Sequence, residues 1–386
     1  MKVLVVHNSY KIKGGEDTVV QNEIELLRTN GVEVVTYFRN NHEIDNYSTI
    51  DKIGLIHSTT YSEKSFDEIA RLIEKHSPDL CHVHNTLPLI SPSVYNACQK
   101  KNVPVVQTLH NYRLGCINGL LLREQKPCED CITKNNPFEG VKHKCYRNSY
   151  VQSYAVARML SVNRKKGFWN SRINRFICLT PFAKNKFIEI GIDQDLIAVK
   201  PNFISVELDE NDVTKTNKFQ VLYMGRLEES KGIQVFLELS KEFSDVSFVV
   251  IGKNVENIDF TNFNVEYKGE LPYQEAQSIM ARSSVLVFPS IWYEGMPMTI
   301  LEAFALKTVV IASNLGAMSS MIQHEKNGLL FNLGDVQNLA KQLTRLRSNP
   351  ELLNELKNNA SSNYKELYTP TSNVQQLLSI YKSVLK

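Results

Sequence analysis

The chain has 386 residues, of which 42% are hydrophobic and 22% are charged, and its formal net charge is +3 at pH 7. This length exceeds one ordinary core, so we expect two domains of roughly 150 to 200 residues each. The sequence contains neither the run of about 18 apolar residues that spans a bilayer nor a secretion signal, so we expect a cytoplasmic protein. In that compartment its seven cysteines would be thiols or metal ligands rather than disulfides.

Short apolar runs alternate with helix-like segments along the chain, as in parallel sheets flanked by helices. In the first half, the predicted strands are Val3–Val6, Val32–Phe38, Leu80–Val83, Val103–Leu109 and Phe176–Leu179, and predicted helices lie near Thr18–Arg28, Phe66–Lys75 and Pro92–Gln99. In the second half, the predicted strands are Phe219–Met224, Val246–Ile251, Val265–Tyr267, Val285–Phe288, Val309–Ala312 and Gly328–Phe331. The sequence therefore predicts an α/β protein with two parallel sheets.

The strand pattern restarts after a polar stretch, Ser205–Lys218, that lacks periodicity and is the best candidate for a linker. We therefore expect one domain over residues 1–201 and a second over residues 202–368. Helical segments near Pro350–Tyr364 and Ser372–Leu385 close the chain, with a break at Thr369-Pro370. The last segment, 369–386, is expected to pack back on the first domain.

Four cysteines lie in a segment between Asn111 and Tyr150 that has no clear periodicity. They are Cys116, Cys128, Cys131 and Cys145, with the spacing C-x11-C-x2-C-x13-C. Long irregular insertions usually need some staple, and four thiolates could hold a structural zinc ion in tetrahedral geometry. Free thiols are the alternative, and the spacing does not decide between the two.

The positive charge of the chain is concentrated in its first half. Residues 1–200 carry 27 Lys and Arg against 20 Asp and Glu, whereas residues 201–386 carry 17 against 21. Residues 142–186 contain eleven basic residues and no acidic ones, with aromatic and apolar side chains between them. This composition is typical of an interfacial helix on anionic lipid, so we expect contact with a membrane surface. A solvated basic helix is the alternative.

Polar and glycine residues follow several of the predicted strands. They are Gly14-Gly15, His84-Asn85, His110-Asn111, the segment Gly225–Lys231, and Glu294. Ligands in open α/β sheets bind beyond the carboxyl ends of the strands, so these loops predict the functional site.

Arg226 and Lys231 lie between an apolar run, Phe219–Met224, and a helix-like stretch, Ile233–Phe243. A helix begins with unpaired N–H groups and the positive end of its dipole, and the two cations add full charges. The segment therefore predicts a site for a diphosphate. A strand-end pair of ordinary surface charges is the alternative.

Two carboxylates, Glu294 and Glu302, are separated by seven residues. Glu302 lies in an apolar helix-like stretch that Pro297 opens, where an unpaired carboxylate would be costly. A hydroxyl-rich ligand such as a sugar would satisfy it. The chain lacks a G-x-G-x-x-G fingerprint, which argues against a dinucleotide-dependent oxidoreductase.

With these motifs the chain resembles the retaining glycosyltransferases of family 4, which have the GT-B fold of two facing Rossmann-like domains with parallel sheets and a cleft between them. The resemblance rests on Glu294-x7-Glu302, on Gly225-Arg226-Leu227 with Lys231-Gly232, and on Lys200-Pro201-Asn202. In the first half, Leu109–Arg113 and Pro127–Cys131 resemble the enzymes of bacterial surface-polysaccharide and lipid-linked oligosaccharide synthesis.

The resemblance also implies a role for each matching residue. Arg226 and Lys231 would hold the donor diphosphate, Glu302 would bind the ribose, and Glu294 would bind near the transferring sugar. His110 would lie near the reacting carbon, as a catalytic residue together with Glu294, and Gly15 would let the backbone approach the phosphates. The donor-binding loop Gly295, Met296, Pro297, Met298 departs from the commoner Gly-Phe-Gly form.

We therefore predict transfer of a sugar from a nucleotide-diphosphate sugar, expected to be a UDP-sugar, to a glycan acceptor that is lipid-linked and belongs to surface polysaccharide synthesis. Retention of configuration follows from the resemblance. No cofactor is expected for catalysis and no nucleic acid as a partner, and the enzyme would lie peripherally at the inner face of the membrane. A nucleotide-sugar epimerase on the same fold and a non-catalytic scaffold are the alternatives. The basic segment favours the transferase, because an epimerase needs no membrane.

Overall fold

The computed structural model describes residues 1–11, 14–206 and 218–385. The chain forms two compact units. The first comprises Met1–Arg123, Cys128–Pro201 and Asn373–Lys386, and the second comprises Glu124–Pro127 and Asn202–Ser372. Most of the predicted linker, residues 207–217, lies outside the described residues.

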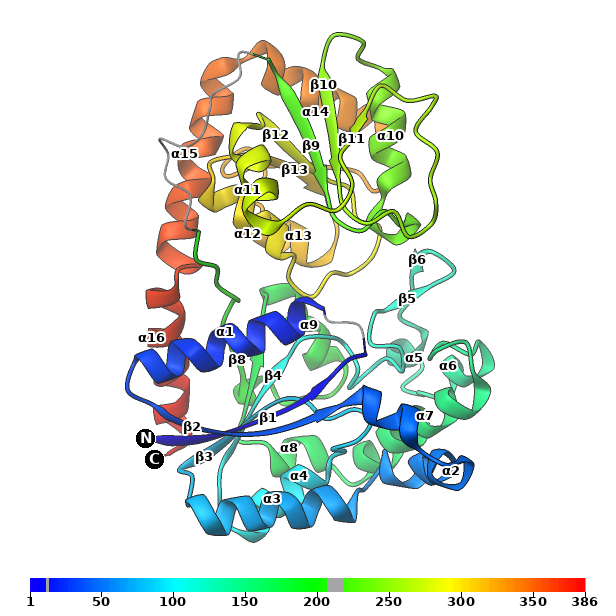
Figure 1. The fold of residues 1–386 in the computed structure, drawn as a ribbon, viewed down its shortest axis with the longest axis vertical. Coiled ribbons are helices and arrows are strands. Elements are labelled where there is room, and N and C mark those ends of the chain that lie inside the picture. Colours follow the sequence, from blue (N-terminus) through cyan, green and yellow to red (C-terminus); the bar gives the residue numbers. More distant parts are fainter. Residues whose placement is uncertain (12–13, 207–217, 386) are drawn as a thin grey trace. The chain divides into compact units, whose positions relative to one another are not determined.

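The first unit is built on a six-stranded parallel sheet with the order β2-β1-β3-β4-β7-β8 (Figure 1). Its strands are β1 Lys2–Ser9, β2 Glu33–Asn40, β3 Leu80–Asn85, β4 Val105–Leu109, β7 Arg175–Cys178 and β8 Ile197–Val199. The five predicted strands of this sheet are confirmed, and its three-residue β8 was not predicted from the sequence pattern. A run this short carries too little periodicity to be recognised.

Helices flank this sheet, as the alternating pattern predicts. They are α1 Gly15–Thr29, α2 Thr49–Ser58, α3 Glu63–His76, α4 Ser93–Lys100, α7 Tyr150–Lys165, α8 Phe168–Arg172, α9 Pro181–Glu189 and α16 Pro370–Val384. The last of these, α16, contributes Leu377 and Tyr381 to the buried cluster that contains Val5 of β1 and Ile24 of α1 (Figure 1). Residues from both ends of the chain thus share one core.

The second unit is built on a six-stranded parallel sheet with the order β11-β10-β9-β12-β13-β14. Its strands are β9 Gln220–Met224, β10 Ser247–Ile251, β11 Glu266–Tyr267, β12 Val285–Phe288, β13 Val309–Ser313 and β14 Leu329–Phe331. The helices are α10 Ile233–Lys241, α11 Tyr273–Arg282, α12 Met298–Ala305, α13 Gly316–Met321, α14 Val336–Ser348 and α15 Pro350–Leu367. All six predicted strands of this half are confirmed.

The strand order fixes where each sheet can bind a ligand. Counted along its own chain segment, the second sheet has the order 3-2-1-4-5-6 of dinucleotide-binding folds, and the order reverses between β9 and β12. In the first sheet the order reverses between β1 and β3. Ligands of doubly wound sheets bind at such switch points, beyond the carboxyl ends of the strands. The loops after these four strands are therefore the positions to inspect.

The insertion between Asn111 and Tyr150 is not irregular, contrary to the expectation from its sequence. It contains a two-stranded sheet, β5 Leu122–Arg123 and β6 Lys126–Pro127, and two short helices, α5 Asp130–Thr133 and α6 Glu139–Lys142. Ile117 and Leu121 are fully buried in it. These elements are two to four residues long, which is below the length at which periodicity can be read.

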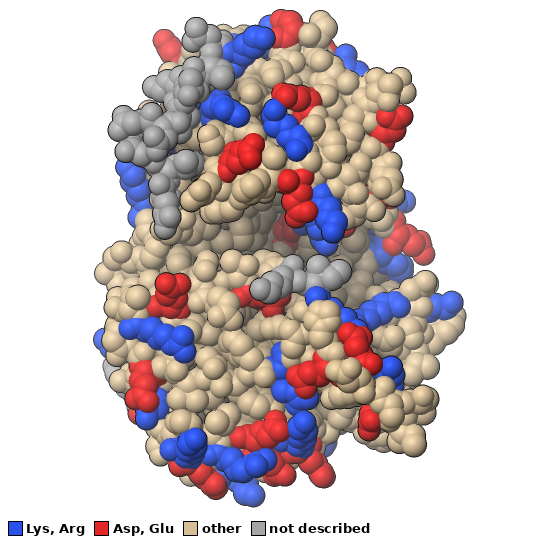
Figure 2. Space-filling view, in the orientation of Figure 1, with Lys and Arg blue, Asp and Glu red and all other residues tan. Residues whose placement is uncertain are grey.

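The basic segment 142–186 forms α7 and α8 and the elements that follow them, and it is only partly the interfacial surface that its composition suggests. Met159, Leu160, Phe168 and Trp169 are buried, so these side chains belong to the core of the first unit. Tyr150, Val151 and Tyr154 remain exposed. Figure 2 shows Lys and Arg side chains interspersed with Asp and Glu on the face that it presents. Within the described part of the chain, the structure has no helix of the length and apolarity that crossing a membrane requires.

Candidate active site

In the second unit the loops after β9 and β12 lie against each other. The backbone N–H of Ile291 donates to the carbonyl of Ser230 at 3.1 Å. Gly232 has φ of +72°, and a Cβ at this position would lie 1.9 Å from the carbonyl oxygen of Pro289. Only glycine permits both that backbone conformation and that approach. The contact brings the predicted cations and the first predicted carboxylate to one switch point.

An ion pair joins the two loops. Lys231 Nζ lies 2.7 Å from Glu294 Oε1, with the side chains 20% and 8% exposed. The hydroxyl of Ser290 donates to the same carboxylate oxygen at 2.8 Å, and Lys231 Nζ lies 4.9 Å from the centroid of the Trp292 ring. The indole N–H of Trp292 is buried and has no hydrogen-bond partner among the described residues. Lys231 is thus held between a carboxylate and an aromatic face.

Arg226 follows β9 and is 60% exposed, with Nη2 2.9 Å from Glu228 Oε1. Between Arg226 and Lys231 the chain forms a short 3-10 turn, Glu229–Lys231, before α10 begins at Ile233. The predicted strand, turn and helix are therefore present. An anion at this loop would compete with Glu228 for the guanidinium group.

The loop Gly295–Met298 is tied to the start of the second unit. The backbone N–H of Asn202 lies 3.2 Å from the sulfur of Met296, and its side-chain amide lies 3.6 Å from the sulfur of Met298. Met296 and Pro297 are buried. This departure from the commoner loop form therefore has a packing role, because the methionine side chains contact the segment that enters the unit.

Glu302 lies on α12, which begins directly after this loop. Glu302 is only 7% exposed. Burial raises the pKa of its carboxyl group above the usual value, while a hydrogen bond from Tyr273 of α11 opposes that rise. A hydroxyl donor from a ligand would stabilise the charged carboxylate in the same way.

In the first unit, Gly15 is the first residue of α1, after β1. A Cβ at Gly15 would meet no atom within 4 Å, so the described residues leave room for a ligand beside this backbone. The neighbouring carboxylate of Glu16 accepts a hydrogen bond from Tyr10 at 3.2 Å. Burial raises the pKa of Glu16 to about 8, while Tyr10 and Arg113 oppose the rise.

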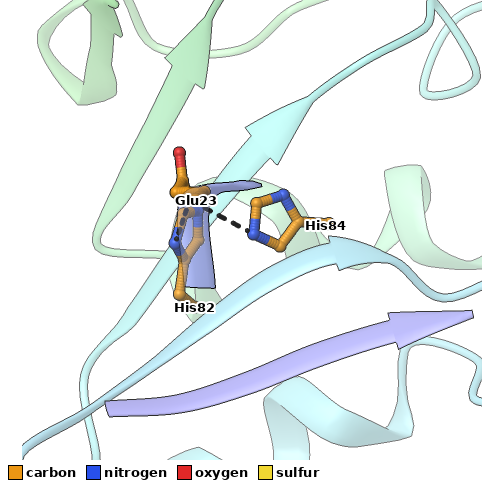
Figure 3. Close-up of side chains that lie close together, drawn as sticks. All are labelled: Glu23, His82 and His84. Carbon is orange, nitrogen blue, oxygen red and sulfur yellow. Dashed lines mark ion pairs between the residues drawn. The ribbon is translucent and has the colours of Figure 1, made fainter. Parts of the chain in front are cut away.

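His110 follows β4, and its Nε2 lies 2.9 Å from Nδ1 of His84, the residue before the last of β3. Behind them His82 and Glu23 complete a buried cluster, shown without His110 in Figure 3. Burial lowers the pKa of His110 well below its usual value, and neighbouring histidines add to the effect. His110 is therefore a neutral imidazole near pH 7, able both to donate and to accept a hydrogen bond.

The four cysteines of the insertion are free thiols, with Cys116 and Cys131 buried and Cys128 and Cys145 half-buried. Burial raises the pKa of Cys131 to about 12 and that of Cys145 to about 11. Among the described residues, the group whose three ligand atoms lie within 4.8 Å of one another is Glu23, His82 and His84, and the cysteines form no such group. Zinc binding by these four cysteines stays a prediction.

The predicted site residues are divided between the units. Gly15 and His110 lie in the first unit, and Arg226, Lys231, Glu294, the loop Gly295–Met298 and Glu302 lie in the second. Sequence reasoning missed Ser290, Trp292 and Tyr273 around the second set. A Ser, Trp or Tyr beside a turn carries no signal of its own. Their proximity to the charged residues follows only from the packing of the loops.

Comparison with known proteins agrees with this geometry. The sequence pattern described as Glycosyltransferase Family 4 matches residues 13–208, which is more than half of the chain. The chain belongs to glycosyltransferase family 4. A second pattern, Glycosyl transferases group 1, matches residues 206–363.

Relatives of known name are distant but cover most of the chain. An uncharacterized glycosyltransferase of Methanocaldococcus jannaschii is 23% identical over 93% of this chain and 92% of its own length. The Escherichia coli UDP-Gal:alpha-D-GlcNAc-diphosphoundecaprenol alpha-1,3-galactosyltransferase is 25% identical over 75% of this chain and 78% of its own length.

Among solved structures, Anabaena HepE in complex with UDP has a TM-score of 0.70 at 15% identity, covering 99% of this chain and 100% of its own. The family 4 protein described here thus has the GT-B fold, and the predicted fold class is confirmed. It is a nucleotide-sugar-dependent glycosyltransferase. Nothing in the comparisons supports the epimerase or the scaffold.

Proposed function

We propose that this glycosyltransferase moves a sugar from a UDP-sugar to a hydroxyl group of a lipid-linked glycan acceptor, with retention of configuration, in surface polysaccharide synthesis. The bond between the anomeric carbon and the diphosphate oxygen breaks, and a bond from that carbon to the acceptor oxygen forms. UDP leaves with the negative charge on its diphosphate, and a diphosphate oxygen takes the proton of the acceptor hydroxyl. Retention is included because of the family resemblance.

One observation carries the proposal: Lys231 and Glu294 form an ion pair where the strand order of the second sheet reverses, and Arg226 lies in the same loop after β9. Negative charge develops on the diphosphate as the nucleotide leaves, and fixed cations stabilise that charge most effectively when they are already oriented. Lys231 is oriented by Glu294 and Trp292 before any ligand arrives. An ammonium group has three N–H donors, so it can bind Glu294 and a phosphate oxygen together.

The other residues have roles that follow from their chemistry. Glu302 accepts hydrogen bonds from the ribose hydroxyls, and Glu294 accepts one from the transferring sugar. His110, as a neutral imidazole, binds the sugar near the reacting carbon. Gly15 lets the phosphates approach the backbone at the start of α1. None of these roles requires a divalent metal in our proposal.

A UDP-sugar donor is supported by the likeness of the fold to Anabaena HepE, which binds UDP. A lipid-linked acceptor is supported by the E. coli relative, whose name gives a diphosphoundecaprenol-linked sugar as its substrate.

A membrane-surface location is supported by α2 and α7 of the first unit. No residue of α2 is buried, although the helix contains Ile50 and Ile53, which are 81% and 61% exposed. Val151 of α7 is 59% exposed, and a groove of about 550 Å³ lined by residues of α2 and α7 includes Ile53 and Val151. Lys52 and Arg147 line the same groove. Apolar side chains flanked by cations are the pattern that binds anionic lipid.

A transfer assay tests the proposal. The protein is incubated with each of a panel of UDP-, GDP- and dTDP-sugars, with and without undecaprenyl-diphosphate-linked GlcNAc. We expect release of UDP from one donor that depends on the acceptor, and a product whose new glycosidic bond keeps the donor configuration by NMR. Donor conversion without an acceptor would instead indicate an epimerase or a hydrolase. Inversion would overturn the retaining assignment.

Vesicle sedimentation tests the membrane surface. We expect the protein to sediment with phosphatidylglycerol vesicles, less so at high salt, and to stay in solution with phosphatidylcholine. The substitution Ile53→Asp should weaken binding, whereas the same change at Leu333, an exposed leucine of the second unit, should not. Equal binding of both variants would contradict the proposed surface.

A further inference from the structure

Behind His110 the first unit contains a chain of buried polar groups that the proposed function does not use. Lys200 Nζ lies 3.0 Å from Glu23 Oε2, and His84 Nε2 lies 3.4 Å from Glu23 Oε1. His84 Nδ1 in turn lies 2.9 Å from His110 Nε2. Figure 3 shows one ring nitrogen of His82 and one of His84 directed at Glu23, with dashed lines marking the two ion pairs.

These groups are deeply buried: Lys200 is 1% exposed, Glu23 2% and His84 4%. Within this group of side chains in the described residues, Glu23 Oε1 and His84 Nε2 have no hydrogen-bond partner, although His82 Nδ1 also lies 3.2 Å from Glu23 Oε1. Since these two atoms are only 3.4 Å apart, a small rotation pairs them. Paired buried polar groups are strongly favoured over unpaired ones.

The direction of each hydrogen bond between these side chains follows from the chemistry of Lys200 and Glu23. Lys200 can only donate, and the charged carboxylate of Glu23 can only accept. Burial alone would raise the pKa of Glu23, but Lys200, His82 and His84 lower it well below its usual value, so Glu23 is charged. His84 must then carry its proton on Nε2, facing Glu23, which leaves its Nδ1 as an acceptor. His110 Nε2 is therefore the donor to His84.

We propose that Glu23, His84 and Lys200 are positioning residues that fix the tautomer of His110, with the proton on Nε2 and Nδ1 left as an acceptor for a sugar hydroxyl. The use of Nδ1 for the sugar rests on the proposed function, but the tautomer does not. Lys200 already balances the charge of Glu23, so a second cation at His84 would leave a net positive charge in a buried cluster, which is costly.

The same three side chains, Glu23, His82 and His84, have the ligand types of a divalent metal site. Two observations favour the positioning role. A metal ion would lie close to the ammonium group of Lys200, whose charge it would repel. Both ring nitrogens of His82 also have hydroxyl partners already, with Nδ1 2.6 Å from Tyr381 Oη and Nε2 2.8 Å from Thr108 Oγ1.

The substitution Glu23→Gln tests the inference sharply. Lys200 would take the amide oxygen, so the amide nitrogen would face His84 Nε2 and donate to it. His84 would then carry its proton on Nδ1 and donate it to Nε2 of His110. His110 would therefore carry its own proton on Nδ1. Nitrogen-15 NMR of the histidine rings reads the tautomer directly, because the unprotonated ring nitrogen resonates well downfield of the protonated one. His110→Gln identifies the His110 signals among the nine histidines.

We expect Nε2–H for His110 in the wild type and Nδ1–H in E23Q. The matched control is Asp17→Asn, the same chemical change on the same helix α1, where the carboxylate pairs with His7 at 2.9 Å outside this chain of groups. D17N should leave the His110 signals unchanged. If E23Q does not fold, His84→Phe keeps the Lys200–Glu23 pair and should give a mixture of His110 tautomers.

Transfer activity is measured separately, so the two proposals can fail independently. In E23Q we expect kcat to fall by about tenfold or more with little change in KM for the donor, as for other residues that orient a functional group. An unchanged His110 tautomer in E23Q, or a doubly protonated His84 in the wild type, overturns the inference even if the enzyme transfers sugar. One equivalent of zinc retained by the wild type and lost in E23Q overturns it in favour of a metal site.

Discussion

The ammonium nitrogen of Lys231 lies 2.7 Å from Glu294 Oε1, and this ion pair joins the loops that follow β9 and β12. Lys231 is thus oriented without a ligand, and Glu294 has a counter-charge although it is nearly buried. Our proposal gives the pair two functions that can be separated by experiment: it would stabilise the two loops, and it would provide the cation for the leaving diphosphate.

The contribution of this pair to stability is measured by a double-mutant cycle. Lys231→Met removes the ammonium group that lies 2.7 Å from the nearly buried carboxylate of Glu294, so we expect it to destabilise the protein by about 1 to 3 kcal/mol. Adding Glu294→Gln should recover part of that loss, with a coupling energy of about 1 kcal/mol or more. Urea unfolding of the wild type, both single variants and the double variant gives the coupling. Additive effects within error would show that the pair does not stabilise the loops.

A substitution at Arg226 can change turnover without changing stability, because the side chain is largely exposed. The variant Arg226→Ala should keep the wild-type unfolding midpoint and lower kcat by about 10²-fold, the cost of removing one group that stabilises transition-state charge. Arg345→Ala is the matched control, since Arg345 forms a similar exposed ion pair with Glu325 in the same unit. Equal turnover of R226A and R345A would remove Arg226 from the proposed role.

Glu302 should make nucleotide binding depend on pH. Burial raises the pKa of this carboxyl group, and only the charged form accepts hydrogen bonds from two ribose hydroxyls. UDP affinity should therefore weaken as the pH falls from 8 to 5, and in Glu302→Gln it should be weaker at pH 8 and nearly independent of pH. Isothermal titration calorimetry at several pH values measures this. A parallel pH dependence in the wild type and E302Q would assign the effect to another group.

Most of the fold could be predicted from apolar runs. The eleven predicted strands all form. A strand such as β12, which is buried on both faces of a parallel sheet, is apolar throughout and so stands out in the sequence. The end of each apolar run also marks the loop that follows the strand. Arg226, Lys231 and Glu294 could therefore be predicted as residues of such loops. The three-residue β8 and the short elements of the insertion carry no such signal.

What the sequence could not provide is the set of contacts between distant residues. The buried Lys200 meets Glu23 across 177 positions of the chain, and His82 meets Tyr381 across 299. A lysine and a glutamate are read as surface residues when their partners are unknown. The burial of apolar side chains in the basic segment was missed for the converse reason, since Met159, Leu160, Phe168 and Trp169 are core residues whereas Tyr150, Val151 and Tyr154 are exposed.

Glu16 gives a prediction for stability against pH. Its pKa is raised to about 8 in the folded protein, against about 4.5 when unfolded, so the folded state binds the proton more tightly. The favourable contribution of this proton is complete below pH 4.5 and is lost as the pH rises toward 8. Relative to the wild type, Glu16→Gln should therefore be more stable at pH 9 than at pH 5, by at least about 1 kcal/mol. Thermal unfolding across this range checks it, and a constant difference would contradict the shifted pKa.

The central claim is that a nucleotide diphosphate binds the second unit at the switch point between β9 and β12. Hydrogen–deuterium exchange with and without UDP tests it most directly, because it reads binding at each segment without requiring the acceptor. We predict slower exchange over residues 225–232 and 294–302 when UDP is present, and loss of that protection in R226A. Protection confined to other segments, or unchanged exchange at saturating UDP, would contradict the account.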